Sequence, residues 1–301
     1  IFEAGSSVVP LTMMEASEAF ESQAELEARV AALRQLSSQE SVPAVHDIVQ
    51  ACRRGELITL TRTVAGVGRM VGYKKPLELR FQSSKQTEHD VQEAAVVLGS
   101  AASLLPAATW RGVTVVEVGC GSGYVGVLLA ALGARVVLTD LASLDSVVSG
   151  NISMNLSAIR PPASANFCPL DWTRPRATIP ASVALIDAAW VFASDPVVDA
   201  SSEAAFLTFV RAVLGLDGER PMCMGLEGLI VSHKHQQSLC IPGYRPPTLD
   251  GPPSITLAEE CSRCSFRLAL EDIGVDVADW HAPPHDFLHP FVDCWCLTAA
   301  E

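Results

Sequence analysis

Basic side chains are scarce in this chain of 301 residues, which has 21 lysines and arginines against 34 aspartates and glutamates. The formal net charge is −13. A surface this acidic repels a phosphate backbone, so we expect no nucleic acid partner, and a basic, lysine-bearing protein segment is the better match. Long apolar runs are also missing. The charge-free run 118–134 contains five glycines and falls short of the roughly 18–20 apolar residues that a membrane span needs, so we expect no membrane partner.

The chain also lacks the cysteine spacing of a disulfide framework. Its nine cysteines are an odd number, and several lie inside apolar runs, where a reduced thiol packs as a small hydrophobe. This usage favours a reducing compartment. We therefore expect a cytoplasmic protein, with the nucleus as the alternative location.

A group of cysteines and histidines near the C-terminus invites interpretation as a zinc site. Its members are Cys261, Cys264, His281, His285, His289, Cys294 and Cys296. The first two cysteines fall inside a helical pattern, and the last two fall on one face of an alternating strand pattern at 291–297. We therefore expect packed thiols and no metal site, with zinc as the minor alternative.

An alternation of helical and strand patterns from residue 90 onward predicts an α/β fold. Apolar residues make up 49% of the chain, which is enough for a sizeable core. Strands separated by helices form a doubly wound, mostly parallel sheet. Strands are expected at 113–118, 135–139, 166–170, 188–194, 228–232 and 291–297, and helices at 91–105, 124–132, 144–156, 202–214 and 255–270. The proline-rich stretch 241–254 is expected to be a loop.

Residues 1–84 are expected to form an N-terminal extension ahead of the main domain at 85–301. Helical spacings predict helices at 15–36 and 42–54. The segments 57–61 and 77–81 have strand patterns on either side of a glycine-containing turn. The extension is therefore a helical and β addition to the α/β domain.

The most informative segment is a glycine-rich loop between the first two predicted strands of the main domain. It reads Val115-Val-Glu-Val-Gly-Cys-Gly-Ser-Gly-Tyr-Val-Gly126, and the next strand ends at Asp140. Gly119, Gly121 and Gly123 allow a tight turn and a close approach of the backbone to a ligand. Asp140 is placed to accept hydrogen bonds from ribose hydroxyls.

Two nucleotide cofactors fit this loop. Residues 121–126 match the G-x-G-x-x-G fingerprint of dinucleotide-binding proteins, with an acid about 20 residues further on. The acid Glu117 and the additional Gly119 extend this pattern to E-x-G-x-G-x-G, which is typical of proteins that bind S-adenosylmethionine (SAM). SAM has no pyrophosphate, but its amino group and sulfonium are cationic, and a carboxylate near the loop favours them. We therefore expect SAM, with NAD as the alternative and a ligand-free glycine turn as the third interpretation.

Further candidate residues follow later strands, at the edge where ligands bind in sheets of this kind. Asp171 and Trp172 follow the third predicted strand, where an aspartate can accept from the adenine amino group and a tryptophan can supply an aromatic wall. Asp195 and Asp199 follow the fourth strand, and a turn is the alternative role for an aspartate before proline. His233, beyond the fifth strand, is expected at the surface or the substrate rim.

Five segments, in this order, resemble methyltransferase family 16, a seven-strand group that contains many protein-lysine methyltransferases. They are Glu117-Val-Gly-Cys-Gly-Ser-Gly-Tyr-Val-Gly, Gly133-Ala-Arg-Val-Val-Leu-Thr-Asp140, Asn151-Ile-Ser-Met-Asn155, Leu170-Asp-Trp172 and Ala193-Ser-Asp195. The resemblance covers about 85–300 and implies a seven-strand, Rossmann-like methyltransferase fold. It also implies which residues surround SAM: Gly119, Cys120, Gly121, Asp140, Trp172 and the backbone of Ala193 and Ser194.

The resemblance implies a SAM-dependent methyltransferase that modifies lysine side chains of a protein substrate. Asp195 is then the candidate catalytic residue, because its carboxylate can hold and orient the incoming ammonium, and Asp199 can assist. The chain departs from the family at two positions, with Val198 in place of a tyrosine and Gln92 in place of a tryptophan. The alternatives are a small-molecule methyltransferase and a catalytically silent SAM-binding or scaffold protein, which the missing tyrosine favours.

Overall fold

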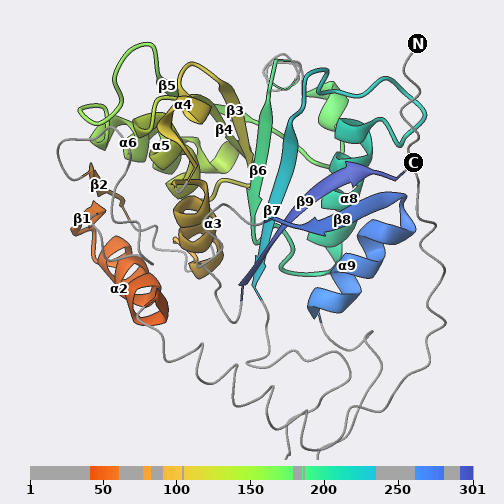
Figure 1. The fold of residues 1–301 in the computed structure, drawn as a ribbon, viewed down its shortest axis with the longest axis horizontal. Helices are drawn as coiled ribbons and strands as arrows, with labels where there is room; N and C mark the ends of the chain where they lie inside the picture. The colour runs from red at the N-terminus through yellow and green to blue at the C-terminus, as the bar shows by residue number, and fades with distance from the viewer. Residues whose placement is uncertain are drawn as a thin grey trace, which may run out of the picture.

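One large sheet between two layers of helices forms the body of the protein (Figure 1). The computed structural model describes residues 41–60, 77–82, 91–103, 105–178, 185, 187–234, 262–280 and 292–300. The helix predicted at 15–36 and the loop predicted at 241–254 lie outside the described residues. The helices and strands below are those of the described part of the chain.

The sheet has seven strands in the order β5-β4-β3-β6-β7-β9-β8. Their bounds are β3 Thr114–Val118, β4 Arg135–Asp140, β5 Ser164–Pro169, β6 Trp190–Ser194, β7 Gly228–Lys234, β8 Val275–Asp279 and β9 Val292–Ala299. The first five of these strands pair in parallel, and β9 runs antiparallel to both β7 and β8. The predicted doubly wound, mostly parallel seven-strand sheet is therefore confirmed.

The edge strand β8 was not among the strands expected from the sequence. It alternates buried and exposed positions over only five residues, with Val275 and Val277 facing the core. It follows α9 after a short turn at Gly274, whose φ is +84°. A strand this short with a half-exposed pattern gives a weak periodic signal, which is why the expectation missed it.

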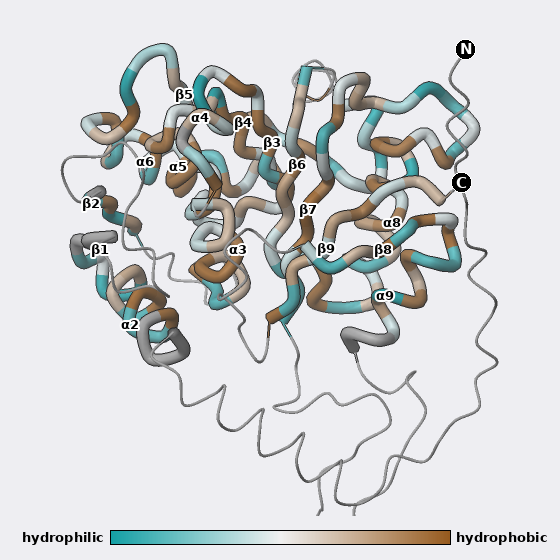
Figure 2. The backbone as a smooth tube through the Cα atoms, viewed as in Figure 1, coloured by the Kyte–Doolittle hydropathy of each residue, from teal (hydrophilic) through white to brown (hydrophobic). Residues whose placement is uncertain are grey.

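The helices cover both faces of the sheet and bury two hydrophobic clusters against it (Figures 1 and 2). One cluster joins the sheet to α3, α5 and α6, and the other joins it to α8 and α9. Helix α5 is buried on all sides, which explains its uniformly apolar sequence. The helix bounds are α3 Glu93–Ser103, α4 Ala107–Trp110, α5 Tyr124–Ala131, α6 Asp145–Met154, α8 Ala200–Leu214 and α9 Ser262–Asp272, with 3-10 turns η2 Ala142–Leu144 and η3 Pro175–Ala177.

The described part of the N-terminal extension packs on the same core. Helix α2 (Ser41–Arg53) buries Val45, Val49 and Cys52 in the cluster that contains α3 and α5. Strands β1 (Leu57–Leu60) and β2 (Leu77–Arg80) pair antiparallel beside it (Figure 1). The predicted helix and strand pair are confirmed, and the domain boundary at residue 84 stays a prediction.

Among the described residues, the helices are all too short or too polar to cross a membrane.

Candidate functional site

The candidate site lies where the sheet changes direction. From β3 the chain proceeds outward through β4 and β5, and then returns to form β6 on the other side of β3. Loops that leave the carboxyl ends of such neighbouring strands diverge and leave a crevice for a ligand. The loops at this edge are 119–123 after β3 and 195–199 after β6.

The glycine loop has the backbone conformation that its sequence predicts. Gly119, Gly121 and Gly123 have φ values of +64°, +53° and +80°, in the left-handed region that favours glycine. Gly123 is the N-cap of α5. A Cβ atom on Gly119 would lie 2.6 Å from the indole of Trp172, so only glycine fits under this ring. The loop therefore presents bare backbone at the carboxyl edge of the sheet.

Glu117 is a buried carboxylate directly beneath the loop. Its side chain is 1% exposed, and Oε2 accepts a hydrogen bond of 2.7 Å from the N–H of Gly126. Its Oε1 is buried without a hydrogen-bond partner among the described residues. Burial raises the pKa of Glu117 to about 8, against the lowering effect of the Gly126 N–H. A cation placed near Oε1 would stabilise the ionised form.

Asp140 ends β4 beside the loop and is part of its structure. Its Oδ2 accepts from the N–H of Gly121 at 2.9 Å, and its Oδ1 accepts from the N–H of Leu141 at 2.7 Å. These two bonds fix the direction of the carboxylate. Asp140 therefore lies against the glycine loop, as the sequence predicted. Its hydrogen bonding to ribose hydroxyls stays a prediction.

Asp171 and Trp172 follow β5 on the same edge. The indole of Trp172 packs over Gly119 and meets Phe206 edge-on, with the ring centroids 5.3 Å apart. The oxygens of Asp171 accept from the Thr173 N–H and hydroxyl, at 2.9 and 2.7 Å, and from Arg174. The hydrogen bonds from Thr173 lower the pKa of Asp171. Trp172 thus forms a wall of the site. The Asp171 carboxylate instead stabilises the turn that contains it, through its bonds with Thr173 and Arg174. The predicted contact of Asp171 with adenine stays a prediction.

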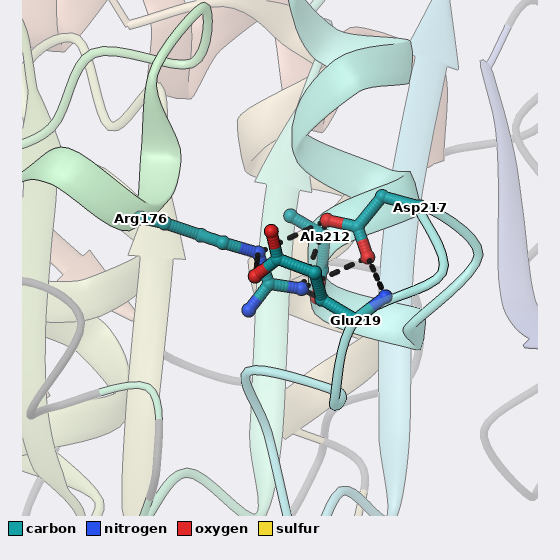
Figure 3. Close-up of polar contacts among 4 residues, drawn as sticks. All are labelled: Arg176, Ala212, Asp217 and Glu219. Carbon is teal, nitrogen blue, oxygen red and sulfur yellow. Dashed lines mark hydrogen bonds and ion pairs between the residues drawn. The ribbon is translucent and has the colours of Figure 1, made fainter.

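An ion-pair network fixes the segment that follows Trp172. Arg176 in η3 contacts Asp217 and Glu219 beyond α8, with shortest distances of 2.9 and 3.2 Å (Figure 3). The same guanidinium donates to the carbonyl oxygen of Ala212 at 3.3 Å. The Arg176 side chain is 30% exposed, so the network is partly shielded from solvent. It ties the loop that carries Trp172 to the end of α8.

Asp195 directly follows β6 and has an unusual backbone. Among the described residues it alone has a positive φ without being glycine, with a value of +47°. Such a conformation costs a non-glycine residue about 1–3 kcal/mol, and residues that adopt it cluster at functional sites. The Asp195 N–H donates to the carbonyl oxygen of Ser232 at 2.7 Å, and its Oδ1 accepts from the Lys234 N–H at 3.1 Å. Ala193 and Ser194 precede it in β6, paired with β7.

Residues at the end of β7, His233 and Lys234, complete this edge of the sheet. His233 is 2% exposed, and so the expectation of a surface or rim position is wrong. Its Nδ1 lies 3.3 Å from Oδ1 of Asp195. Lys234 forms an ion pair of 2.8 Å with Glu93 of α3. The alternation of β7 places His233 on the same face as Val231, and this pattern was the available signal for its burial.

Asp199 has a structural role in the described chain. It is the N-cap of α8, where its side chain accepts from the Ser202 N–H at 2.7 Å in a capping box. Its pKa is lowered chiefly by this bond. Val198, which replaces the family tyrosine, is 71% exposed. Participation of Asp199 in catalysis stays a prediction, and the geometry favours Asp195 over it.

Two asparagines, Asn151 in α6 and Asn155 at its C-cap, connect the loop with the N-terminal extension. Asn151 donates to the carbonyl oxygen of Ser122 at 2.8 Å and accepts from the Gln82 N–H at 2.7 Å. Asn155 accepts from the Arg80 N–H and donates to the Arg80 carbonyl oxygen, at 2.8 and 2.7 Å. Both side chains are at most 2% exposed. The segment 151–155 carries part of the family resemblance, but its contacts with Arg80 and Gln82 were not predicted from the sequence.

The thiols at the site are packed side chains. Cys120 lies in the glycine loop, and burial, together with Glu117 and Asp140, raises its pKa well above the ordinary value. A thiol of this kind stays protonated and is a poor metal ligand or nucleophile. Within the described ranges, no group of three or more histidine, cysteine or acidic side chains could hold a metal ion. Cys261 and the three histidines of the zinc alternative lie outside those ranges.

Comparison with known proteins gives a family match and several structural neighbours. The profile of the lysine methyltransferase family matches residues 73–233 and so includes β2. EEF1A lysine methyltransferase 3 of Xenopus tropicalis is 41% identical over 63 residues, or 21% of this chain, and the match spans 27% of the length of that relative.

Structural neighbours include the glycopeptide N-methyltransferase MtfA with S-adenosyl-L-homocysteine, at 14% identity and a TM-score of 0.43 over 69% of this chain and 90% of that one. Another is magnesium protoporphyrin IX methyltransferase of Synechocystis PCC 6803 with bound SAH, at 16% identity and a TM-score of 0.40 over 73% of this chain and 89% of that one.

Proposed function

Since the chain belongs to the lysine methyltransferase family, we propose that it binds SAM and transfers its methyl group to a lysine side chain of a protein substrate. The observation that carries this proposal is the arrangement at the strand switch. A glycine loop held by Glu117 and Asp140 lies next to the strained Asp195 at the end of the neighbouring strand. Glu117 and Asp140 suit a cationic nucleoside, and Asp195 suits the ammonium of a lysine.

The residues of the loop fit SAM on two observations. The buried Oε1 of Glu117 has no hydrogen-bond partner among the described residues, and it suits the cationic amino group of the cofactor. The indole of Trp172 packs directly on Gly119, so it supplies an aromatic wall beside the loop, against which the flat adenine of the cofactor can lie. When bound, SAM would supply an electrophilic methyl group on its sulfonium, which would pass to a neutral amine as the C–S bond breaks and S-adenosylhomocysteine leaves.

The protein contributes position and electrostatics to this transfer. Asp195 attracts the lysine ammonium and holds its nitrogen at the carboxyl edge of β6. The lysine must lose a proton before it can attack, because its ordinary pKa is about 10.4. This proton leaves to water, so Asp195 needs only to orient the amine. Trp172 and the loop exclude water from one side of the site.

The negative net charge of the chain and its similarity to the Xenopus methyltransferase both support a basic protein as the substrate. The net charge of −13 favours approach of a lysine-rich segment. The Xenopus relative is named for EEF1A, and we propose EEF1A as the first substrate to test. A cytoplasmic location, which the cysteine usage favours, is part of this proposal, with the nucleus as the alternative.

A catalytically silent SAM-binding protein is the second candidate. Val198 supports it, because the family tyrosine near the substrate lysine is replaced here by an exposed aliphatic side chain. Such a protein would bind SAM and would not transfer its methyl group to protein. The two candidates share the cofactor and differ in turnover.

The test is transfer of deuterated methyl groups from SAM to recombinant EEF1A, located by peptide mass spectrometry. We expect methylated lysine with the wild-type chain, loss of it with Asp195→Asn, and retention with Asp276→Asn. Asp276 is an exposed carboxylate on the edge strand β8 and serves as the matched control. SAM binding without transfer to EEF1A or to any protein of a cell extract would favour the silent candidate.

A further inference from the structure

His233 is a polar side chain buried in an aromatic pocket at the end of β7. Its ring centroid lies 5.2 Å from that of Phe266 in α9 and 6.0 Å from that of Trp295 in β9. It is 2% exposed, and neither ring nitrogen has a hydrogen-bond partner of good geometry among the described residues. Burial of a polar group without a partner costs about 1–3 kcal/mol. Apolar packing alone does not explain an imidazole in this pocket.

The nearest polar atom in the pocket belongs to Asp195. Oδ1 of Asp195 lies 3.3 Å from Nδ1 of His233 and accepts from the Lys234 N–H at 3.1 Å. Both contacts engage Oδ1, and in the described chain they leave Oδ2 for a ligand. The carboxylate is 24% exposed, so it lies between the buried imidazole and the solvent. His233 and Lys234 of β7 thus contact one of the two carboxylate oxygens of Asp195.

The other charged groups near His233 come from neighbouring strands and from α3. Asp293 lies directly across from it in the register of β7 and β9. Lys234 follows it in sequence and pairs with Glu93 of α3, on the opposite side of the strand. Among the described residues, Asp195 and Asp293 are therefore the two carboxylates placed to accept a hydrogen bond from the ring.

We propose that His233 is a positioning residue for lysine methylation, which donates a hydrogen bond from Nδ1 to Oδ1 of Asp195 and so aims Oδ2 at the substrate ammonium. The inference rests on the proposed function. In structures without substrate, hydrogen bonds of this kind are often long or poorly aligned and tighten when the substrate binds. The backbone of Asp195 is strained, and a residue at φ +47° keeps this conformation only when its surroundings hold it. The contact with His233 is one of the interactions that hold it.

The first test measures the position of the proton on His233 and does not depend on activity. The full chain is labelled with 15N-histidine, and the signals of His233 are identified by their loss in His233→Asn. We expect a proton on Nδ1, with signals that shift in Asp195→Asn and stay unchanged in Asp293→Asn. A neutral ring protonated only on Nε2 would overturn the proposal. A shift in Asp293→Asn alone would do so too.

The second test compares two substitutions of His233 in methyl transfer to recombinant EEF1A. His233→Phe keeps an aromatic ring in the pocket and removes the donor, whereas His233→Asn can place an amide N–H near the position of Nδ1. We expect His233→Phe to lower kcat/KM at least tenfold, chiefly through KM for the protein. We expect His233→Asn to recover most of this loss.

SAM affinity within twofold of the wild type in both variants would show that they are folded. Equal activity of His233→Phe and wild type would contradict the proposal, and so would equal losses in both variants. If the wild type transfers no methyl group, the proposed function fails, and the position of the proton still decides whether His233 supports Asp195.

Discussion

Replacement of Glu117 by glutamine should make the stability of the protein less dependent on pH. In the folded chain, burial raises the pKa of this carboxyl to about 8, whereas an unfolded chain leaves a glutamate near its ordinary pKa of about 4.3. Each unit of this difference is worth about 1.36 kcal/mol. Ionised Glu117 therefore lowers the free energy of unfolding by about 5 kcal/mol at a pH above both values.

The direction of the effect follows from which state holds the proton. Below about pH 4 Glu117 is protonated in both states, and the wild type has its full stability. As the pH rises toward 8, the unfolded chain ionises and the folded chain does not, so the wild type loses stability. Glutamine cannot ionise, and its carbonyl oxygen can still accept from the Gly126 N–H. Between pH 5 and pH 8 the variant should gain about 3–4 kcal/mol relative to the wild type.

Urea unfolding followed by tryptophan fluorescence measures this difference at pH 5, 6, 7 and 8 and constant ionic strength. Glu227→Gln, which changes an exposed carboxylate, is the matched control and should leave the pH dependence of the wild type unchanged. Parallel curves for wild type and Glu117→Gln would refute the reasoning, because they would mean that burial does not raise the pKa of Glu117.

Three further substitutions test other contacts. Asp140→Ala removes the acceptor of the Gly121 N–H and the predicted partner of the ribose, and it should weaken SAM binding by about 2–3 kcal/mol, or roughly 30- to 150-fold, in a calorimetric titration. Arg176→Ala breaks the network at the end of α8 and should lower the free energy of unfolding by about 1 kcal/mol, with a smaller effect at high salt; no salt dependence would contradict the ion-pair assignment. Asn155→Leu leaves two backbone groups of Arg80 without their partner and should lower the free energy of unfolding by about 2–3 kcal/mol, as thermal unfolding would measure.

The central part of the fold could be predicted because its signals are local. The strand before Gly119, the glycine loop, helix α5 and the acid at Asp140 are consecutive in sequence, and each imposes its own backbone conformation. The cap at Asp199 has a local signal as well, because aspartate is a favoured N-cap residue, although Asp199 was expected to assist catalysis and not to cap a helix. Structure that depends on neighbours only a few residues away can therefore be predicted from the sequence.

The parts that could not be predicted depend on distant contacts. Strand β8 gains its place only through pairing with β9, which enters the sheet between it and β7. The alternation of β7 signals the burial of His233, but the groups that cover it, α9 and Trp295, come from a later part of the chain and could not be identified from the sequence. Asn155 binds Arg80 in β2 and Asn151 binds Gln82 just after it, each from about 70 residues away. Nothing in the local sequence of these residues identifies their partners.

A calorimetric titration of the wild-type chain with SAM, with NADH as the control ligand and Asp140→Ala as the control variant, tests the central claim most directly. The proposed site predicts micromolar binding of SAM by the wild type, much weaker binding by the variant, and no binding of NADH. Absence of SAM binding by the wild-type chain, or binding of equal strength by Asp140→Ala, would contradict the assignment of the glycine loop as the cofactor site.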